Sequence, residues 1–240
     1  MHTQIPTAAG PFVIAAKDPC DMRVVSVINQ KGGAGKSTTV MNLASVVAEH
    51  SRVLVVDVDP QLSVTSWATT AEELPDDRRL PFDVVAETDV EVLAQLRGAD
   101  YDTIFVDTPG NLENMAVLKA VVANSDFVIL PTEPTALAML PLVNTFNSIV
   151  EPGGVDYRVV ITKVDSRSLV DATDAQDELR DAGLKVCKSY VRSYKVHERA
   201  PLTGQVVTTY DKTRAAEKAG ADYKDVAREL LSIWANQETR

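Results

Sequence analysis

The chain has 240 residues, of which 45% are hydrophobic and two are cysteines, and its formal net charge is −10. This length suits one α/β domain with a sizeable core, while the strong negative charge argues against general affinity for nucleic acid. No run approaches the ~18 apolar residues of a membrane span, and two cysteines without a CxxC spacing exclude a zinc ribbon or a disulfide framework.

Residues 1–21 form an extension that is rich in Ala, Pro and Thr. It lacks the basic start and long apolar core of a secretory signal, so we expect a cytoplasmic protein with reduced thiols. We expect this extension to be partly disordered. Residues 22–240 are then expected to form a single domain.

Short apolar runs alternate with helical periods along the rest of the chain. This pattern is typical of a doubly wound, mostly parallel sheet flanked by helices. Strands are expected over residues 24–28, 53–58, 101–107, 126–130, 157–161 and 185–190. Helices are expected over residues 37–49, 90–96, 112–124, 136–150, 169–182 and 211–235. The polar stretch 70–81, with two prolines, is expected to be a surface loop.

A glycine-rich turn joins the first strand to the first helix. Its pattern is G-x-x-x-x-G-K-[ST] with the first glycine relaxed, which predicts a phosphate-binding loop. Glycines let the backbone curl and point its N–H groups inward, and the helix dipole favours anions at this end. Lys36 is expected to reach the β- and γ-phosphates, and Ser37 to hold Mg²⁺. The predicted nucleotide-binding residues are Gly32, Gly33, Ala34, Gly35, Lys36, Ser37 and Thr38.

A second lysine, Lys31, stands five residues before Lys36. Together they complete K-G-G-x-G-K-[ST], which resembles the deviant Walker A motif of the ParA/MinD family of P-loop ATPases. The resemblance is closer to short ParA-type partition ATPases without an N-terminal helix-turn-helix domain. It implies ATP as the nucleotide, and it implies that Lys31 crosses a dimer interface to the partner's ATP. The alternative is that Lys31 is a solvated surface charge.

The second strand ends in Asp57-Val58-Asp59-Pro60-Gln61. Carboxylates at the carboxyl end of a parallel strand lie at the ligand edge of the sheet. ParA relatives carry a similar D-x-D-P-Q here, which implies that Asp59 positions the attacking water and senses the γ-phosphate. Asp57 is expected to hold the loop or the waters of Mg²⁺. A role for Asp59 in capping the helix that follows is the alternative.

Another apolar run ends in Asp107-Thr108-Pro109-Gly110, which has the Walker B pattern of a strand ending in aspartate. Asp107 is expected to hold Mg²⁺, partly through water, because this ion keeps most of its hydration shell. Thr108, Pro109 and Gly110 resemble the second switch, which reports the γ-phosphate.

These motifs predict an ATPase that converts ATP and water to ADP and phosphate. Lys31, Lys36 and Asp59 are the expected catalytic residues, since phosphoryl transfer needs positioning and neutralisation of charge. No arginine finger is evident, so hydrolysis is expected to be slow and dependent on the dimer.

Residues 184–218 hold eight basic and three acidic residues in an otherwise acidic chain. Such a zone can bind an anionic polymer locally. The resemblance implies non-specific DNA binding here, while a solvated basic face or salt bridges to the acidic remainder is the alternative. The DNA-binding candidates are Arg192, Lys195, Arg199, Lys212, Arg214 and Lys218.

As a ParA-type partition ATPase, the chain would form an ATP-sandwich homodimer on non-specific nucleoid DNA. A centromere-binding, ParB-type partner would stimulate hydrolysis and release. The polar end of the chain, residues 236–240, differs from the membrane-targeting helix of MinD, so no membrane partner is expected. Two alternatives remain: a MinD-like or ParA-like positioning ATPase with a non-DNA cargo, and an ATP-dependent metabolic ligase on the same fold.

Overall fold

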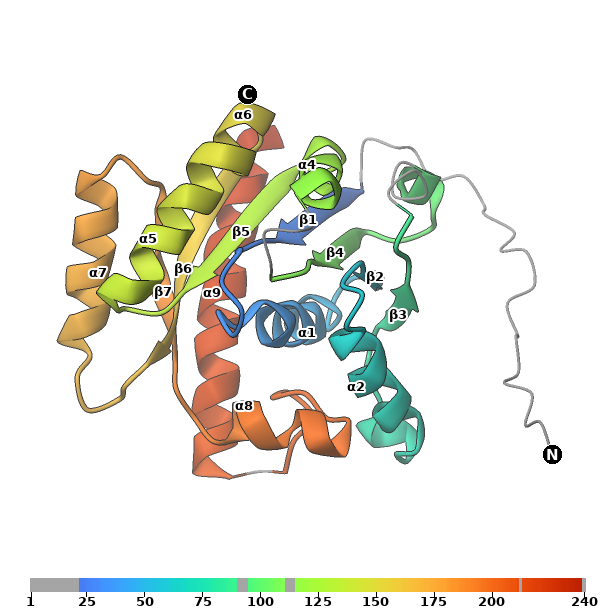
Figure 1. Cartoon of the computed structure of the whole chain (residues 1–240). Coiled ribbons are helices and arrows are strands. Elements are labelled where there is room, and N and C mark those ends of the chain that lie inside the picture. Colours follow the sequence, from blue (N-terminus) through green and yellow to red (C-terminus); the bar gives the residue numbers. More distant parts are fainter. Residues whose placement is uncertain (1–21, 90–94, 111–114, 212, 239–240) are drawn as a thin grey trace.

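The computed structural model describes residues 22–89, 95–110, 115–211 and 213–238. Seven strands form one sheet in the order β3-β2-β4-β1-β5-β6-β7, and every pairing is parallel. Helices cover both faces of the sheet (Figure 1). The strands are β1 (Arg23–Val27), β2 (Val53–Asp57), β3 (Asp83–Ala86), β4 (Thr103–Asp107), β5 (Phe127–Thr132), β6 (Asp156–Val164) and β7 (Val186–Arg192). The predicted doubly wound α/β fold is confirmed.

Continuous apolar runs form the central strands because both faces of the sheet are covered. All five residues of β2 and of β4 are buried. Two hydrophobic clusters, one on each side of the sheet, make up the core. On one side the sheet packs against α1 (Lys36–Val47), α2 (Ser63–Glu72), α8 (Val196–Arg199) and α9 (Arg214–Glu238). On the other it packs against α4 (Met115–Ala123), α5 (Ala136–Thr145) and α7 (Val170–Asp181).

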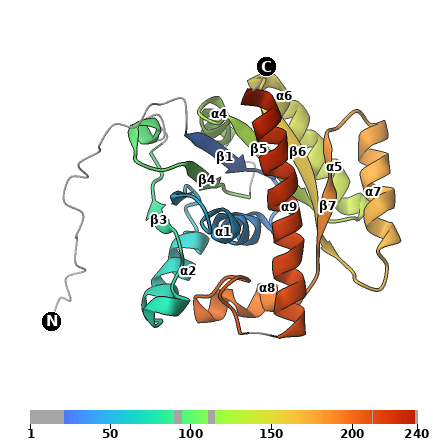
Figure 2. The ribbon, with the colours of Figure 1, turned by 180° about the vertical axis from the view of Figure 1, so that it is seen from behind.

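The long helix α9 spans the molecule beside α1, as the view from behind shows (Figure 2). Its buried stripe includes Tyr223, Val226, Leu230 and Trp234. The Trp234 ring meets Phe127 of β5 edge-on, with 5.7 Å between the ring centroids. The apolar stripe of this helix is therefore core packing. Within the described residues, no helix combines the length and apolarity needed to cross a membrane.

Several elements differ from the sequence prediction. The stretch 70–81 is not wholly a loop, because α2 extends to Glu72 and a 3₁₀ turn, η1, spans Asp76–Arg78. The edge strand β3 was not predicted, since its four residues are only partly buried. The predicted helix 136–150 divides into α5 and a π-turn, η4 (Phe146–Val150), followed by α6 (Glu151–Gly153).

Two further short turns, η2 (Leu96–Gly98) and η5 (Pro201–Thr203), complete the described elements. The predictions for residues 1–21, for most of helix 90–96 and for the start of helix 112–124 lie outside the described residues.

Candidate nucleotide-binding site

The glycine-rich loop lies between β1 and α1, at the carboxyl edge of the sheet. Gly33 and Gly35 have φ of +76° and +88°, a left-handed backbone that L side chains rarely adopt. Gly35 directly precedes α1, so the first N–H groups of this 12-residue helix have no intrahelical acceptor. Ala34 between them is buried, and its carbonyl accepts a hydrogen bond of 3.3 Å from the Thr162 hydroxyl. The left-handed glycines and the free N–H groups at the start of α1 thus form a turn that suits phosphate.

A cavity of about 530 Å³ opens above this loop. It brings together the loop, the segment after β2 and the segment after β4, which lie far apart in sequence. Its lining includes Gly32, Gly33, Gly35, Lys36, Ser37, Thr38, Asp59, Pro60, Gln61, Ser63, Pro109, Gly110 and Lys163. The structure therefore places most of the predicted nucleotide-binding and switch residues around one space.

Lys36 is buried at the base of the cavity. Burial lowers the pKa of its ammonium, while the nearby charges of Asp107 and Asp59 oppose that shift. The backbone of Gly110 passes directly over this side chain. A Cβ added at Gly110 would lie 2.7 Å from the Lys36 Nζ and 3.3 Å from the Cα of Gly32. A side chain at this position would require the Lys36 ammonium to move and the phosphate loop to give slightly.

Ser37 and Asp107 form a direct link between α1 and the end of β4. The Ser37 hydroxyl donates a hydrogen bond of 2.6 Å to Oδ2 of Asp107. The other carboxylate oxygen, Oδ1, is buried and has no hydrogen-bond partner among the described residues. Burial raises the pKa of Asp107 to about 7, against the hydrogen bond from Ser37 and the charge of Lys36. An orphaned carboxylate oxygen beside a hydroxyl fits the hard oxygen ligands that Mg²⁺ requires.

Asp57 holds the loop that follows β2. This fully buried carboxylate accepts hydrogen bonds from the backbone N–H of Asp59 at 3.1 Å and of Thr65 at 2.9 Å. The Thr65 hydroxyl adds a third at 3.0 Å. Thr65 lies in the first turn of α2, so Asp57 satisfies one of the orphan donors of that helix.

Asp59 faces the cavity rather than capping the helix. One of its oxygens accepts the N–H of Gln61 at 2.9 Å, a short side-chain turn. Leu62 follows with φ of +52°, a left-handed conformation at the start of α2. Glycine adopts this conformation without strain, whereas a leucine does not. The loop thus keeps its shape here at some cost in backbone strain.

Thr108 has a different position from its neighbours. Its buried hydroxyl donates a hydrogen bond of 2.7 Å to the carbonyl of Val27. This contact joins the ends of β4 and β1 and turns the side chain away from the cavity. Thr108 therefore anchors the segment that carries Pro109 and Gly110.

Lys31, directly before the cavity-lining Gly32, has Glu133 as its ion-pair partner. The Lys31 Nζ is 3.6 Å from Oε2 of Glu133. Lys163 donates to the other oxygen of the same carboxylate at 2.9 Å and to the carbonyl of Gly33. Glu133 and Lys163 were not predicted from the sequence. Both stand at the carboxyl ends of strands, β5 and β6, which is the same signal that identified Asp59 and Asp107.

A second, smaller cavity of about 190 Å³ adjoins the phosphate loop at Gly35 and Thr38. The Tyr194 hydroxyl and Nε2 of His197 are buried there without a hydrogen-bond partner among the described residues. Burial lowers the pKa of His197 to about 4, so its imidazole is neutral at pH 7. The cavity thus offers unsatisfied neutral polar groups beside Gly35 and Thr38 of the predicted phosphate loop.

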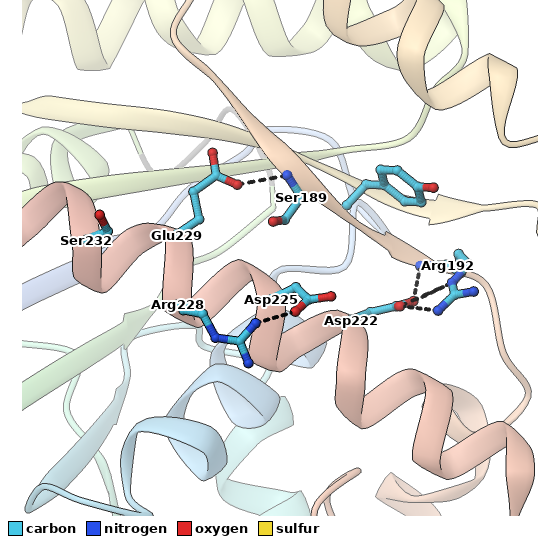
Figure 3. Close-up of a pocket in the computed structure, with 8 residues that line it drawn as sticks. Ser189, Arg192, Asp222, Asp225, Arg228, Glu229 and Ser232 are labelled. Atoms are coloured by element: carbon cyan, nitrogen blue, oxygen red, sulfur yellow. Dashed lines mark hydrogen bonds and ion pairs between the residues drawn. The ribbon is translucent and has the colours of Figure 1, made fainter.

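Arg192 pairs with an acidic residue of the same chain. It donates from its backbone N–H to Asp222 at 2.9 Å and from Nε to the same carboxylate at 3.0 Å (Figure 3). Nearby, Glu229 accepts the N–H groups of Lys188 and Ser189, each at 2.8 Å. Two acids of α9 therefore cover the N–H groups of the edge strand β7. Several of the residues that make these contacts line a cavity of about 630 Å³. The ion pairs drawn there join residues of this chain to one another.

The other basic candidates lie at the end of the molecule formed by α8 and the start of α9. Lys195, Arg199, Arg214 and Lys218 are exposed. None of the four is paired with an acid in the part of the chain that the structure describes. The candidate Lys212 lies outside the described residues.

Comparison with known proteins agrees with this geometry. Residues 25–231 match the family described as the CobQ/CobB/MinD/ParA nucleotide binding domain. A maintenance of carboxysome distribution protein A from Gloeobacter kilaueensis is 42% identical over 213 residues, which cover 88% of this chain and 95% of that protein. The sporulation initiation inhibitor protein Soj of Bacillus subtilis is 28% identical over 257 residues, covering 88% and 98%.

Among solved structures, an ATP complex of a Cyanothece McdA variant has a TM-score of 0.67 at 14% identity, covering 88% of this chain and 96% of that chain. This likeness confirms the fold, and the matched family agrees with the phosphate loop and the Ser37–Asp107 pair described above. The chain belongs to the CobQ/CobB/MinD/ParA family of nucleotide-binding domains.

Proposed function

We propose that the chain is an ATPase of the ParA/MinD type that positions a cellular cargo through an ATP-dependent homodimer on DNA. The observation that carries this proposal is the orphaned oxygen of Asp107, held by Ser37 beside Lys36 under the phosphate loop. A buried carboxylate without a partner is costly unless a ligand satisfies it.

Each group of residues contacts a different part of bound ATP, according to its position in the site. The loop N–H groups and Lys36 bind the phosphates, while the small cavity with Tyr194 and His197 takes the nucleoside end. Mg²⁺ on Ser37 and Asp107 neutralises phosphate charge when it is bound. Asp59 faces the same space and accepts a hydrogen bond from a water that approaches the terminal phosphate. Asp57 keeps Asp59 in place through the two N–H groups it holds.

Dimer dependence rests on Lys31. Lys36 already lines the cavity and Lys31 does not, so the second lysine has its best use outside its own site. The helix that follows Glu133, α5, presents the largely exposed Leu137 and Leu140, which favours a second copy of the protein as the partner.

The identity of the cargo is the more specific part of the proposal. The name of the Gloeobacter kilaueensis relative refers to carboxysome distribution, and at 42% identity this favours a protein assembly as the cargo. The second candidate is DNA partition with a ParB-type partner, which the Soj relative and the exposed basic end of α8 and α9 support. We propose that both share the same ATP cycle and the same DNA surface.

Turnover of purified protein with Mg²⁺-ATP tests the enzymatic proposal. Wild type should hydrolyse ATP slowly, Lys36→Ala should lose binding, and Asp59→Ala should bind without turnover. Rapid hydrolysis by Asp59→Ala would move the water-positioning role to another residue. To separate the cargoes, a fluorescent fusion is imaged in its own cells with the chromosome and any large protein assemblies labelled. Loss of even spacing of an assembly, with normal chromosome inheritance, in a Lys36→Ala strain supports the first cargo.

A further inference from the structure

We propose that Glu133 is the resting partner of Lys31, which keeps this lysine in its own subunit until dimerisation around nucleotide draws it away. This inference rests on the proposed dimer and identifies a residue that regulates its formation. Glu133 would thus be a positioning residue that sets how readily the dimer forms.

The Glu133 carboxylate pairs with two lysines, of which Lys163 lines the cavity. Oε2 of Glu133 is 3.6 Å from the Lys31 ammonium, and Oε1 accepts a hydrogen bond of 2.9 Å from Lys163. Lys163 is held a second time by the carbonyl of Gly33 in the phosphate loop. The contact with Lys31 is therefore the longer and the less supported of the two. If one lysine leaves when a better anion arrives, it is Lys31.

The ion pair between Lys31 and Glu133 is strong enough to favour the resting position of the Lys31 side chain but weak enough to break when nucleotide binds. The side chains of Lys31, Glu133 and Lys163 are 28%, 23% and 47% exposed. Partly exposed ion pairs of this kind change an equilibrium by about twofold to fivefold. The phosphates of a nucleotide offer several negative charges and so compete well with one shared carboxylate.

Glu133 stays charged in the resting subunit. Partial burial alone would raise its pKa, but the hydrogen bond from Lys163 and the charges of Lys163 and Lys31 lower it. When Lys31 leaves, Lys163 remains as the counter-ion of Glu133. The carboxylate is therefore not stranded, and release of Lys31 carries only the loss of its own contact.

Substitution Glu133→Gln tests the inference, because it keeps the shape of the side chain and removes its charge. The matched control is Glu151→Gln, an exposed carboxylate on α6 that changes the net charge by the same amount. In the first measurement, nucleotide-free full-length protein is acylated briefly with an amine-reactive ester. The rate at Lys31 is read by mass spectrometry against exposed Lys119 on α4.

A lysine released from its ion pair presents its amine to the reagent more often and therefore reacts faster. Glu133→Gln should therefore raise the relative rate at Lys31 by about twofold to fivefold, while Glu151→Gln should leave it unchanged. An unchanged rate in Glu133→Gln would overturn the resting pair.

The second measurement is the protein concentration at which half of the chain is dimeric with a non-hydrolysable ATP analogue. Glu133→Gln should lower that concentration about twofold to fivefold at low salt, and the difference should shrink as salt screens the pair. An equal or weaker dimer would show that Glu133 does not restrain Lys31, and would overturn the inference.

If the wild-type chain stays monomeric with nucleotide, the proposed function is refuted. The proposal that Glu133 regulates dimerisation is then refuted as well. The acylation rates would then still decide whether Glu133 holds Lys31.

Discussion

The Ser37 hydroxyl donates a 2.6 Å hydrogen bond to Asp107, whose other oxygen is buried without a partner among the described residues. Two elements that are far apart in sequence, the first turn of α1 and the end of β4, thus meet in a half-satisfied polar pair. Such a pair lowers stability in the empty protein and favours the ligand that completes it.

The first prediction concerns metal-dependent nucleotide binding. Asp107→Asn keeps the size of the side chain but removes a charged oxygen ligand for Mg²⁺. The gain in ATP affinity that Mg²⁺ gives to wild type should fall by about 10- to 100-fold in the variant. Fluorescent ATP titrations with Mg²⁺ and with EDTA measure this gain. If the variant and wild type gain equally from Mg²⁺, Asp107 is not part of the metal site.

The second prediction is a dependence of stability on pH. Burial raises the pKa of Asp107 to about 7 from an ordinary value of 3.8. Between these two values the folded metal-free protein holds a proton that the unfolded chain has lost. The free energy of unfolding therefore falls as pH rises through this window and levels off above it.

Asp107→Asn cannot ionise at this position, so it should unfold at higher urea concentration than wild type at pH 8. The difference should be up to ~4 kcal/mol at pH 8 and should narrow towards pH 5. Both proteins are measured without metal or nucleotide. A gap that is equal at the two pH values would contradict the role of this carboxyl.

The third prediction tests the close approach of the segment after β4 to the phosphate loop. In Gly110→Ala the new methyl group would lie 2.7 Å from the Lys36 Nζ. Lys36 must then move, so nucleotide affinity and turnover should drop at least about tenfold, a loss of ~1.4 kcal/mol. Gly98→Ala is the matched control, because nothing lies within 4 Å of a Cβ there. Normal ATP binding by Gly110→Ala would show that the two segments separate when nucleotide binds.

The fourth prediction separates the basic residues that we propose to contact DNA from Arg192, which pairs with Asp222. Lys195→Ala and Arg199→Ala should weaken ATP-dependent binding to DNA of any sequence, and each should reduce the salt slope by about one. Arg192→Ala should instead lower the free energy of unfolding by about 1–3 kcal/mol, because it leaves buried Asp222 with fewer partners. Fluorescence anisotropy over a salt series and urea unfolding provide the two readings. An unchanged salt slope in both surface variants would place the DNA contact elsewhere.

The local motifs could be predicted from the sequence because their function depends on short spacing. A strand, a glycine turn and a helix in direct succession place Lys36 and Ser37 at one edge of the sheet, and the strand that ends at Asp107 leads to the same edge. The edge strand β3 was missed because only four half-exposed residues form it. Helix α2 was not predicted, because the carboxylate that accepts the N–H of its Thr65 is Asp57 of the preceding strand and not the residue just before the helix.

Contacts between residues that are far apart in the chain could not be predicted from the sequence. The DNA contact of Arg192 stays a prediction. Its pairing with Asp222, thirty residues later, could not be predicted because it forms only when α9 packs against β7. In the same way, Lys31 could be identified as an unusual lysine, whereas its contact with Glu133 depends on β5 lying beside β1. Spacing within a motif predicts the chemistry, and the sheet order decides which charges meet.

The central claim is that nucleotide binding and dimerisation are one event, joined by Lys31. Sedimentation velocity of wild type and Lys31→Ala, each with and without a non-hydrolysable ATP analogue and Mg²⁺, tests it most directly. Wild type should shift from monomer to dimer with the analogue, while Lys31→Ala should bind the analogue and remain monomeric. Equal dimerisation of both proteins, or a dimer of wild type without nucleotide, would contradict the account.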